Sequence, residues 1–287
     1  MRVALIGISL SALLFSHPAF SQSRPVAYTE VSRRVDSIYL SYPDGSDKVL
    51  LHRAGNINGP DLNPVLPQVA YWNSTCTCIE LVNYADGVSG AKVTSIEQVA
   101  TGGKVPSFSP DGSKLIYTWS VSASAPQIRW LSLTDGTSGT LVDGVYANDF
   151  AWAGPDRLIY TTSAGEIFEN IIDLGTMQVT SSSLVHKAAN IEGIGTANTK
   201  NHLFFAESTS ASIVIHQMDL GSPAVLGDNT RVRSNIVGGV QPVVSPDDAF
   251  LLYRSEPLGQ LRRISLTTGA VTILSKSPSY RQHDWRP

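Results

Sequence analysis

The chain has 287 residues, of which 42% are hydrophobic and 16% are charged, and its formal net charge is −3. This composition excludes an intrinsically disordered chain, and the slightly acidic balance argues against a nucleic-acid binder, which needs a basic face. The two cysteines are too few to build a disulfide scaffold.

The first residues have the pattern of a secretory signal peptide. Arg2 supplies a short positive region, residues 3–15 are apolar, and Ala19-Phe20-Ser21 offers small residues where cleavage is defined. We therefore expect residues 1–21 to be removed and residues 22–287 to form a single domain in the periplasm or outside the cell. We expect no membrane span, because no stretch approaches about 18 uninterrupted apolar residues.

Six hairpins with a glycine in the turn follow one another along the rest of the chain. Between several of them lies a second hairpin around a Pro-Asp turn, as in PSFSPDGSKLIYTW at residues 106–119. Two hairpins in each unit of about 45 residues give four strands, which is the period of a β-propeller blade. The turn glycines, spaced 39 to 49 residues apart, are Gly45, Gly87, Gly136, Gly175, Gly221 and Gly269.

Each end of the mature chain lacks half of a hairpin. Residues 26–31 have the pattern of the second strand of a blade, and residues 281–286 have that of an innermost strand. A ring of blades needs its ends joined, because an open end leaves unpaired strand edges. The sequence therefore predicts an all-β, six-bladed β-propeller of four-stranded antiparallel blades, in which strand 281–286 pairs with strand 26–31. A closed ring needs no second copy, so we expect a monomer.

Three segments together resemble the TolB-like family of six-bladed propellers with WD-like repeats. They are FSPDGSKLIYT at residues 108–118, IYLSYPDGSDKVLL at residues 38–51 and the terminal DWRP at residues 284–287. The resemblance covers nearly all of the mature chain and implies a periplasmic or secreted propeller that serves as a protein-binding platform. TolB carries an additional α/β domain before its propeller, and only a few residues here separate Ser21 from the first strand. We therefore do not carry over membership of the Tol–Pal system.

Polar residues at the starts of the innermost strands form the candidate binding site, because these strands line the central channel of a propeller. Their oxygen and nitrogen atoms could hold a divalent cation or orient a substrate, and the alternative is a hydrated channel without a ligand. Lys104 falls in the same ring, and its positive charge opposes a cation. We expect no cofactor, with a channel cation as the alternative. The ring consists of Asp61, Asn148, Asp149, Asn190, Glu192, Gln241, His283 and Asp284.

Cys76 and Cys78 lie at the expected hairpin between the second and third strands of the second blade. Export to an oxidising compartment favours a disulfide between them. In an extended chain, however, residues two apart have Cα atoms near the upper limit of separation that a disulfide allows. Three interpretations remain: a structural disulfide that holds the turn (a turn lock), two free thiols without a function, or a disulfide that is reduced in function. Two cysteines alone do not complete a zinc site.

The sequence contains no GxSxG, HExxH or P-loop motif, so we expect no catalytic residue of those kinds. Three functions remain open. The first is a protein- or peptide-binding platform in the cell envelope. The second is a propeller enzyme, either metal-dependent and lactonase-like or carbohydrate-active, that uses the channel residues. The third is a structural accessory in envelope assembly.

Overall fold

The structure is a computed structural model, and the predicted signal peptide lies outside the residues that it describes. In the described part of the chain we find no helix with the length and hydropathy that crossing a bilayer requires. The described residues are 25–31, 35–41, 48–85, 91–120, 125–197, 199–208, 213–220, 230–236, 241–255, 260–275 and 280–285.

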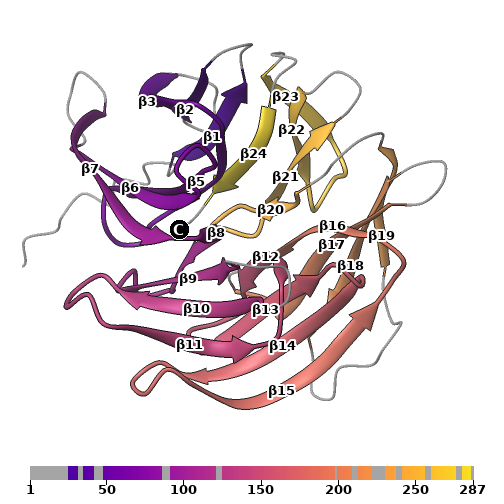
Figure 1. Cartoon of the computed structure of the whole chain (residues 1–287). Coiled ribbons are helices and arrows are strands. Elements are labelled where there is room, and N and C mark those ends of the chain that lie inside the picture. Colours follow the sequence, from indigo (N-terminus) through magenta and orange to yellow (C-terminus); the bar gives the residue numbers. More distant parts are fainter. Residues whose placement is uncertain are drawn as a thin grey trace, which may run out of the picture.

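The described strands form six antiparallel sheets of four strands, arranged as the blades of a ring (Figure 1). Blade one consists of β24 (Tyr280–Trp285), β1 (Val26–Val31), β2 (Asp36–Ser41) and β3 (Val49–Ala54). Blade two consists of β4 (Ile57–Leu62), β5 (Gln68–Asn73), β6 (Cys78–Ala85) and β7 (Lys92–Thr101). Blade three consists of β8 (Gly103–Phe108), β9 (Lys114–Trp119), β10 (Gln127–Ser132) and β11 (Ser138–Asp143).

The second half of the ring repeats this arrangement. Blade four consists of β12 (Ala147–Trp152), β13 (Arg157–Thr162), β14 (Glu166–Asp173) and β15 (Gln178–Lys187). Blade five consists of β16 (Ile191–Thr196), β17 (His202–Ser208), β18 (Ile213–Asp219) and β19 (Thr230–Ile236). Blade six consists of β20 (Val243–Val244), β21 (Phe250–Ser255), β22 (Gln260–Ser265) and β23 (Val271–Ser275).

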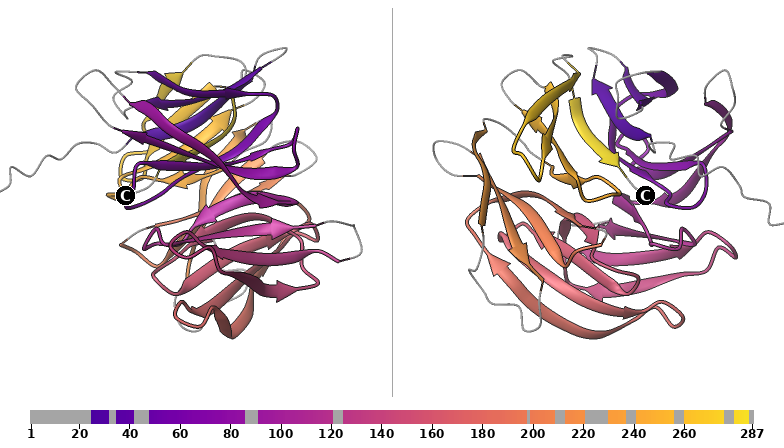
Figure 2. Two further views of the ribbon diagram at one scale, coloured as in Figure 1. Left: turned by 60° about the vertical axis from the view of Figure 1, so that its left-hand side comes forward. Right: turned by 180° about the vertical axis from the view of Figure 1, so that it is seen from behind.

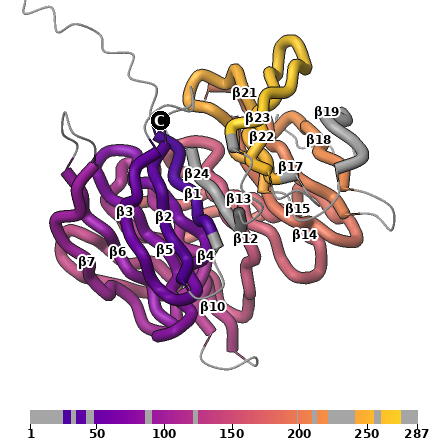
Figure 3. Tube along the Cα trace, turned by 90° about the horizontal axis from the view of Figure 1, so that it is seen from above, coloured from indigo at the N-terminus to yellow at the C-terminus, as the bar shows by residue number. Residues whose placement is uncertain are grey.

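The innermost strands contact one another around the ring in the order β24, β4, β8, β12, β16 and β20, and β20 in turn contacts β24. The ring closes where β24 pairs antiparallel with β1, from Val26 opposite Trp285 to Glu30 opposite Tyr280. Figure 2 shows the two strands side by side from behind, and Figure 3 shows β1, β2 and β3 next to one another along blade one. The predicted six-bladed propeller and its closure are confirmed.

The second strand of each blade is buried on both faces, and successive side chains of a strand point to opposite faces of its sheet. In β9, Leu115 and Tyr117 pack against blade two, whereas Ile116 packs against blade four. Thr118 lies two residues after Ile116, on the same face of the strand. Its Oγ1 donates a hydrogen bond of 2.7 Å to the carbonyl of Ala147 in blade four. A continuous run of apolar and small polar residues in the second strand therefore serves two interfaces.

The buried apolar side chains of the described residues form six clusters, one at each contact between neighbouring blades. The cluster at the closure joins Val26 and Tyr28 of blade one to Leu252 and Leu261 of blade six. The apolar core of this protein is therefore distributed around the ring. Each blade depends on both neighbouring blades for burial of its faces, so the hydrophobic effect favours closure of the ring.

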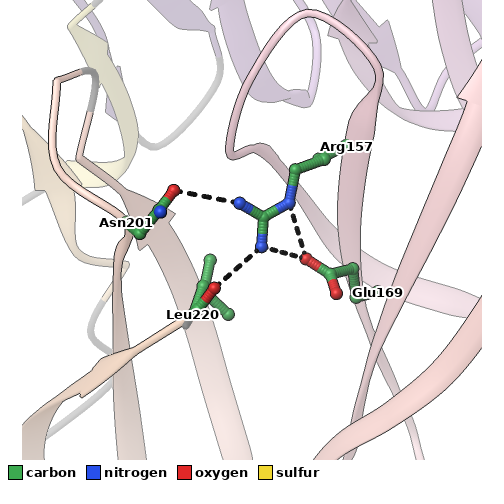
Figure 4. A network of polar contacts seen from close by, with 4 residues as sticks. All are labelled: Arg157, Glu169, Asn201 and Leu220. Carbon is green, nitrogen blue, oxygen red and sulfur yellow. Dashed lines mark hydrogen bonds and ion pairs between the residues drawn. The ribbon is translucent and has the colours of Figure 1, made fainter. Parts of the chain in front are cut away.

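Polar side chains also join neighbouring blades. Arg157 of β13 donates to Glu169 of the same blade through Nε, at 2.8 Å, and through Nη2. It also donates to blade five, from Nη1 to Asn201 Oδ1 at 3.0 Å and from Nη2 to the Leu220 carbonyl at 3.1 Å (Figure 4). The guanidinium thus bridges blades four and five.

Candidate functional site: the central channel

The described innermost strands enclose a cavity of about 350 Å³ on the axis of the ring. It is lined by the later halves of the inner strands of blades two to five, by residues 241–244 of blade six, and by turns that follow some of these strands. None of the described residues that line it is Lys, Arg or His. Its side chains with polar atoms belong to Asp61, Ser107, Asp149, Trp152, Thr196 and Gln241.

Three prolines occupy the same place in their blades along this wall. Pro60, Pro106 and Pro242 each precede the residue that pairs with the second strand, as the pairs Asp61–Ala70, Ser107–Ile116 and Val243–Leu252 indicate. An innermost strand has a free edge toward the channel, and proline suits an edge because it has no N–H to leave unpaired. Three blades therefore present fewer backbone donors to the cavity.

Blades four and five have Phe150 and Ile194 at this place instead, and Asp149 accepts both of their N–H groups. Asp149 Oδ1 accepts from the amide of Phe150 at 3.0 Å, and Oδ2 accepts from the amide of Ile194 at 3.0 Å. Gln241 Nε2 donates to Oδ1 at 3.2 Å. Asp149 is buried, so these bonds also compensate the loss of water around its carboxylate.

Asp61 has a comparable task between blades two and three. Its side chain is buried, and Oδ2 accepts the backbone amide of Phe108 at 2.5 Å. Asp61 does not occupy the same register as Asp149, however. Asp61 pairs with Ala70, the third residue of the second strand of its blade. In blade four, the third residue of the second strand is Ile159, and it pairs with Ala151, two residues after Asp149. The two buried carboxylates thus lie at different levels of the channel wall.

The remaining candidates of the predicted ring do not join these two carboxylates and Gln241 in the cavity wall. Asn148, Asn190 and Glu192 are exposed and are not among the lining residues. Lys104 Nζ lies 5.3 Å from the ring centroid of Trp72 and 5.8 Å from that of Tyr146, in cation–π arrangements. His283 and Asp284 belong to β24, and their side chains lie outside the described part of the structure.

The described acidic side chains of the channel are not grouped as a metal site. Among the residues that the structure describes, Cys76, Cys78 and Glu80 are the one group of three possible ligands with donor atoms within 4.8 Å of one another. They lie at the β5–β6 hairpin, not among the residues that line the cavity. Asp61 and Asp149 both accept backbone amides in place of forming a shared ligand set.

The loop after β4 presents two exposed apolar residues beside the cavity. Val65 is 64% exposed and Leu66 is 50% exposed, and both follow Pro64, which lines the cavity. Asn63 holds this loop, because its Oδ1 accepts the amides of Val65 at 2.9 Å and Leu66 at 3.0 Å. Sequence reasoning missed the pair; the signal was two large apolar residues in a Pro-flanked turn where polar residues are the norm.

Two polar atoms of the lining residues are buried and have no hydrogen-bond partner among the described residues. They are the indole Nε1 of Trp152, a donor, and the side-chain Oε1 of Gln241, an acceptor. Trp152 ends β12 of blade four, and Gln241 lies two residues before the inner strand of blade six. Leaving a buried polar atom without a partner is energetically costly.

Comparison with protein-family models and with curated protein sequences finds no match. Among solved structures, the chain is similar to TolB from Acinetobacter baumannii, with a TM-score of 0.71 and 18% identity over 93% of this chain and 67% of that one. It is also similar to a protein assigned as TolB from Agrobacterium tumefaciens (TM-score 0.65, 14% identity, 88% of this chain and 92% of that one). A third is a protein assigned as a 6-phosphogluconolactonase from Bacteroides fragilis NCTC 9343 (TM-score 0.55, 12% identity, 91% of this chain and 85% of that one).

Identities at this level show the fold alone. The solved structures include both a TolB protein and a protein assigned as a lactonase, so proteins with different names share this architecture. The expected resemblance to TolB-like six-bladed propellers is therefore confirmed for the propeller fold of this chain.

Proposed function

We propose that this protein is an exported propeller that binds an extended segment of a protein partner at the mouth of its central channel. The observation that carries the proposal is the exposed pair Val65 and Leu66 beside a cavity whose lining includes Trp152 and Gln241. Large exposed apolar residues next to a concave site are typical of interaction surfaces. The signal-peptide pattern of residues 1–21 supports export to the cell envelope.

The unpartnered polar atoms of the cavity support a peptide as the ligand. Trp152 Nε1 needs an acceptor, and Gln241 Oε1 needs a donor. An extended peptide offers a carbonyl and an N–H at every residue, so a short stretch of main chain satisfies both atoms. The prolines of the cavity wall leave few competing donors. The described lining contains no Lys or Arg for a phosphate or sulfate group.

A selected peptide provides the test, because the partner itself is not identified. A random peptide library displayed on phage is selected against the immobilised protein, and the selected peptides are measured by fluorescence anisotropy. We expect Val65→Asp with Leu66→Asp to weaken binding by at least about tenfold, since desolvated apolar anchors carry most of such an interface. Trp152→Phe should weaken it several-fold by removing one hydrogen-bond donor.

Leu184→Asp is the matched control, because Leu184 is 37% exposed on the outer strand β15 and does not line the cavity. It should bind the peptides as the unchanged protein does. The proposal is wrong if no peptide is enriched, or if the Val65 and Leu66 variant binds as tightly as the control.

The enzyme alternative is examined with the same protein. A saturable rise in melting temperature with calcium, magnesium, manganese or zinc that is lost in Asp149→Ala with Glu192→Ala would favour a metal-dependent enzyme. Hydrolysis of sugar lactones would point in the same direction. Neither response is expected for a peptide-binding platform. A structural accessory would show no specific peptide binding at this mouth.

A further inference from the structure

The hairpin between β5 and β6 carries a disulfide that its fold does not require. Cys76 and Cys78 are joined across a single residue, and their Cα atoms are 5.2 Å apart. Backbone contacts already fix the hairpin, because the amide of Ser74 donates to the Asn56 carbonyl at 3.1 Å and the amide of Gly102 donates to the Thr77 carbonyl at 2.7 Å. A cross-link stabilises a fold mainly by closing a long loop of the unfolded chain, and this loop is very short.

A second turn of the same length shows that this shape forms without cysteines. Thr77, the last residue of the β5–β6 turn, has a φ of 50°, in the left-handed region that a β-branched residue rarely adopts. Met177, the last residue of the four-residue turn between β14 and β15, has a φ of 54° and no cysteine beside it. The bridge is therefore not what imposes the backbone conformation.

The two cysteine residues differ in their exposure to solvent. Cys76 is exposed, whereas Cys78 is completely buried at the start of β6. The Glu80 carboxylate lies within 4.8 Å of both sulfur atoms. Glu80 is held there by the Tyr71 hydroxyl, which donates to Oε2, and by Asn73 Nδ2, which donates to the same oxygen at 3.0 Å. A reagent from solvent therefore approaches the exposed Cys76 more readily than the buried Cys78.

We propose that the Cys76–Cys78 disulfide is a thiol–disulfide exchange site that accepts two electrons from a dithiol of a partner protein. A partner thiolate attacks Cys76 Sγ and forms a mixed disulfide with it. The Cys76–Cys78 bond breaks, and Cys78 leaves as a thiolate and takes a proton from solvent. The partner's second thiolate then attacks the partner sulfur of the mixed disulfide. The partner ends with a disulfide, and Cys76 leaves as a thiolate and is protonated.

The first test asks whether the bridge opens in the folded protein. The protein is equilibrated in buffers with increasing ratios of reduced to oxidised glutathione, and its free thiols are counted by maleimide-polyethylene glycol labelling on a gel. We expect full reduction without denaturant and a melting temperature that changes by less than about 2 °C, since the cross-link constrains few unfolded states. Resistance until denaturant is added, or a large fall in melting temperature on reduction, would identify a turn lock and overturn the proposal.

Two single-cysteine variants test which sulfur is attacked. In Cys78→Ser the exposed Cys76 remains, and in Cys76→Ser the buried Cys78 remains. We expect Cys78→Ser to form a mixed disulfide with oxidised glutathione at least about tenfold faster than Cys76→Ser, because access controls the exchange rate. Equal rates, or a faster reaction of Cys78, would contradict the assignment.

The Glu80→Gln variant tests whether Cys78 is the leaving group when the bridge is reduced. A negative charge beside Cys78 disfavours its thiolate, so removing that charge should speed reduction of the bridge by a dithiol peptide several-fold. Glu97→Gln is the control, because Glu97 lies on β7 of the same blade and is not among the ligand group at the sulfurs. An unchanged rate in Glu80→Gln would show that Cys78 does not leave next to this carboxylate. Failure of the peptide-binding proposal would leave all of these results unaffected.

Discussion

The side-chain amide of Gln241 donates a hydrogen bond of 3.2 Å to the carboxylate of Asp149, although the two residues belong to blades that are not neighbours in the ring. The same carboxylate accepts the backbone amide of Ile194 from the blade between them. One buried acidic side chain thus connects blades four, five and six at the channel. The ring depends on contacts of this kind because every blade contributes only one strand to the axis.

Asp149→Ala should destabilise the protein by about 2–3 kcal/mol, because it leaves the buried amide of Ile194 without its charged acceptor. Glu192→Ala is the control: Glu192 is exposed on the neighbouring strand, so its removal should change stability by no more than about 0.5 kcal/mol. Urea unfolding followed by tryptophan fluorescence measures both. Equal stability of the two variants would show that the Asp149 carboxylate does not hold these blades together.

Gly195→Ala should also destabilise the ring, for a steric reason. A Cβ at Gly195 would lie 2.2 Å from the backbone carbonyl oxygen of Pro242, so blades five and six would have to separate. Overpacking of this kind costs about 1–3 kcal/mol. Gly154→Ala is the matched control at the same cavity, because the nearest atom to its Cβ would be Arg157 Cδ at 3.8 Å. Differential scanning calorimetry should show a lower melting temperature for the first variant only.

His186 should make the protein less stable in mild acid. Its ring is buried against Phe205, with centroids 4.6 Å apart, and this burial holds the pKa of His186 below its ordinary 6.5. The Glu207 carboxylate opposes the decrease in pKa, and His216 reinforces it. Because the unfolded chain binds the proton first, the free energy of unfolding should fall as pH decreases from about 6.5 toward the folded-state pKa, and stay flat above that range.

Denaturant unfolding between pH 5 and pH 8 checks this dependence in the unchanged protein and in His186→Leu. The variant should lose part of the slope below about pH 6.5, since leucine does not titrate. It should not lose all of it, because burial also lowers the pKa of His52. Identical slopes in the two proteins would show that His186 does not titrate with unfolding.

Arg157→Met should weaken the contact between blades four and five. The side chain of Arg157 is 21% exposed, and its loss removes donors to Glu169, Asn201 and Leu220. We expect a cost of about 1–2 kcal/mol, since several charge-assisted bonds are lost at a partly buried site. Lys187→Met removes an ion pair whose lysine is 56% exposed, and it should cost less than about 1 kcal/mol. Chemical denaturation that ranks the two variants in the opposite order would contradict this view of the network.

The candidate site was predicted only in part, and the inner strands explain why. The predicted ring placed Asp61 and Asp149 at one level, but the two residues differ by two positions in their strands. A β-bulge interrupts the pairing ahead of each of them, in β4 and in β12, so the bulges do not cause the difference. The inner strands share few residue types, so the polar residues near their starts did not indicate their level in the channel.

The apolar pair at the mouth shows a different limit. Val65 and Leu66 are ordinary core residue types, and the Pro-flanked turn in which they lie is the one local sign of their exposure. They are exposed because Asn63 fixes the loop by accepting both of their amides and also donates to the Gly112 carbonyl of blade three at 3.0 Å. Contact with a residue 49 positions away decides this geometry. Local patterns contain no information about it.

The sequence by itself determined the number of blades, the four strands in each and the closure of the ring through the two ends of the chain. These features depend on turn residues and on apolar spacing, which are local and repeat along the chain. Only the tertiary structure decided which polar residues meet in the channel, which carboxylates accept backbone amides and which apolar residues border the cavity. Those properties arise where neighbouring blades touch, so they depend on distances between segments that the order of residues does not contain.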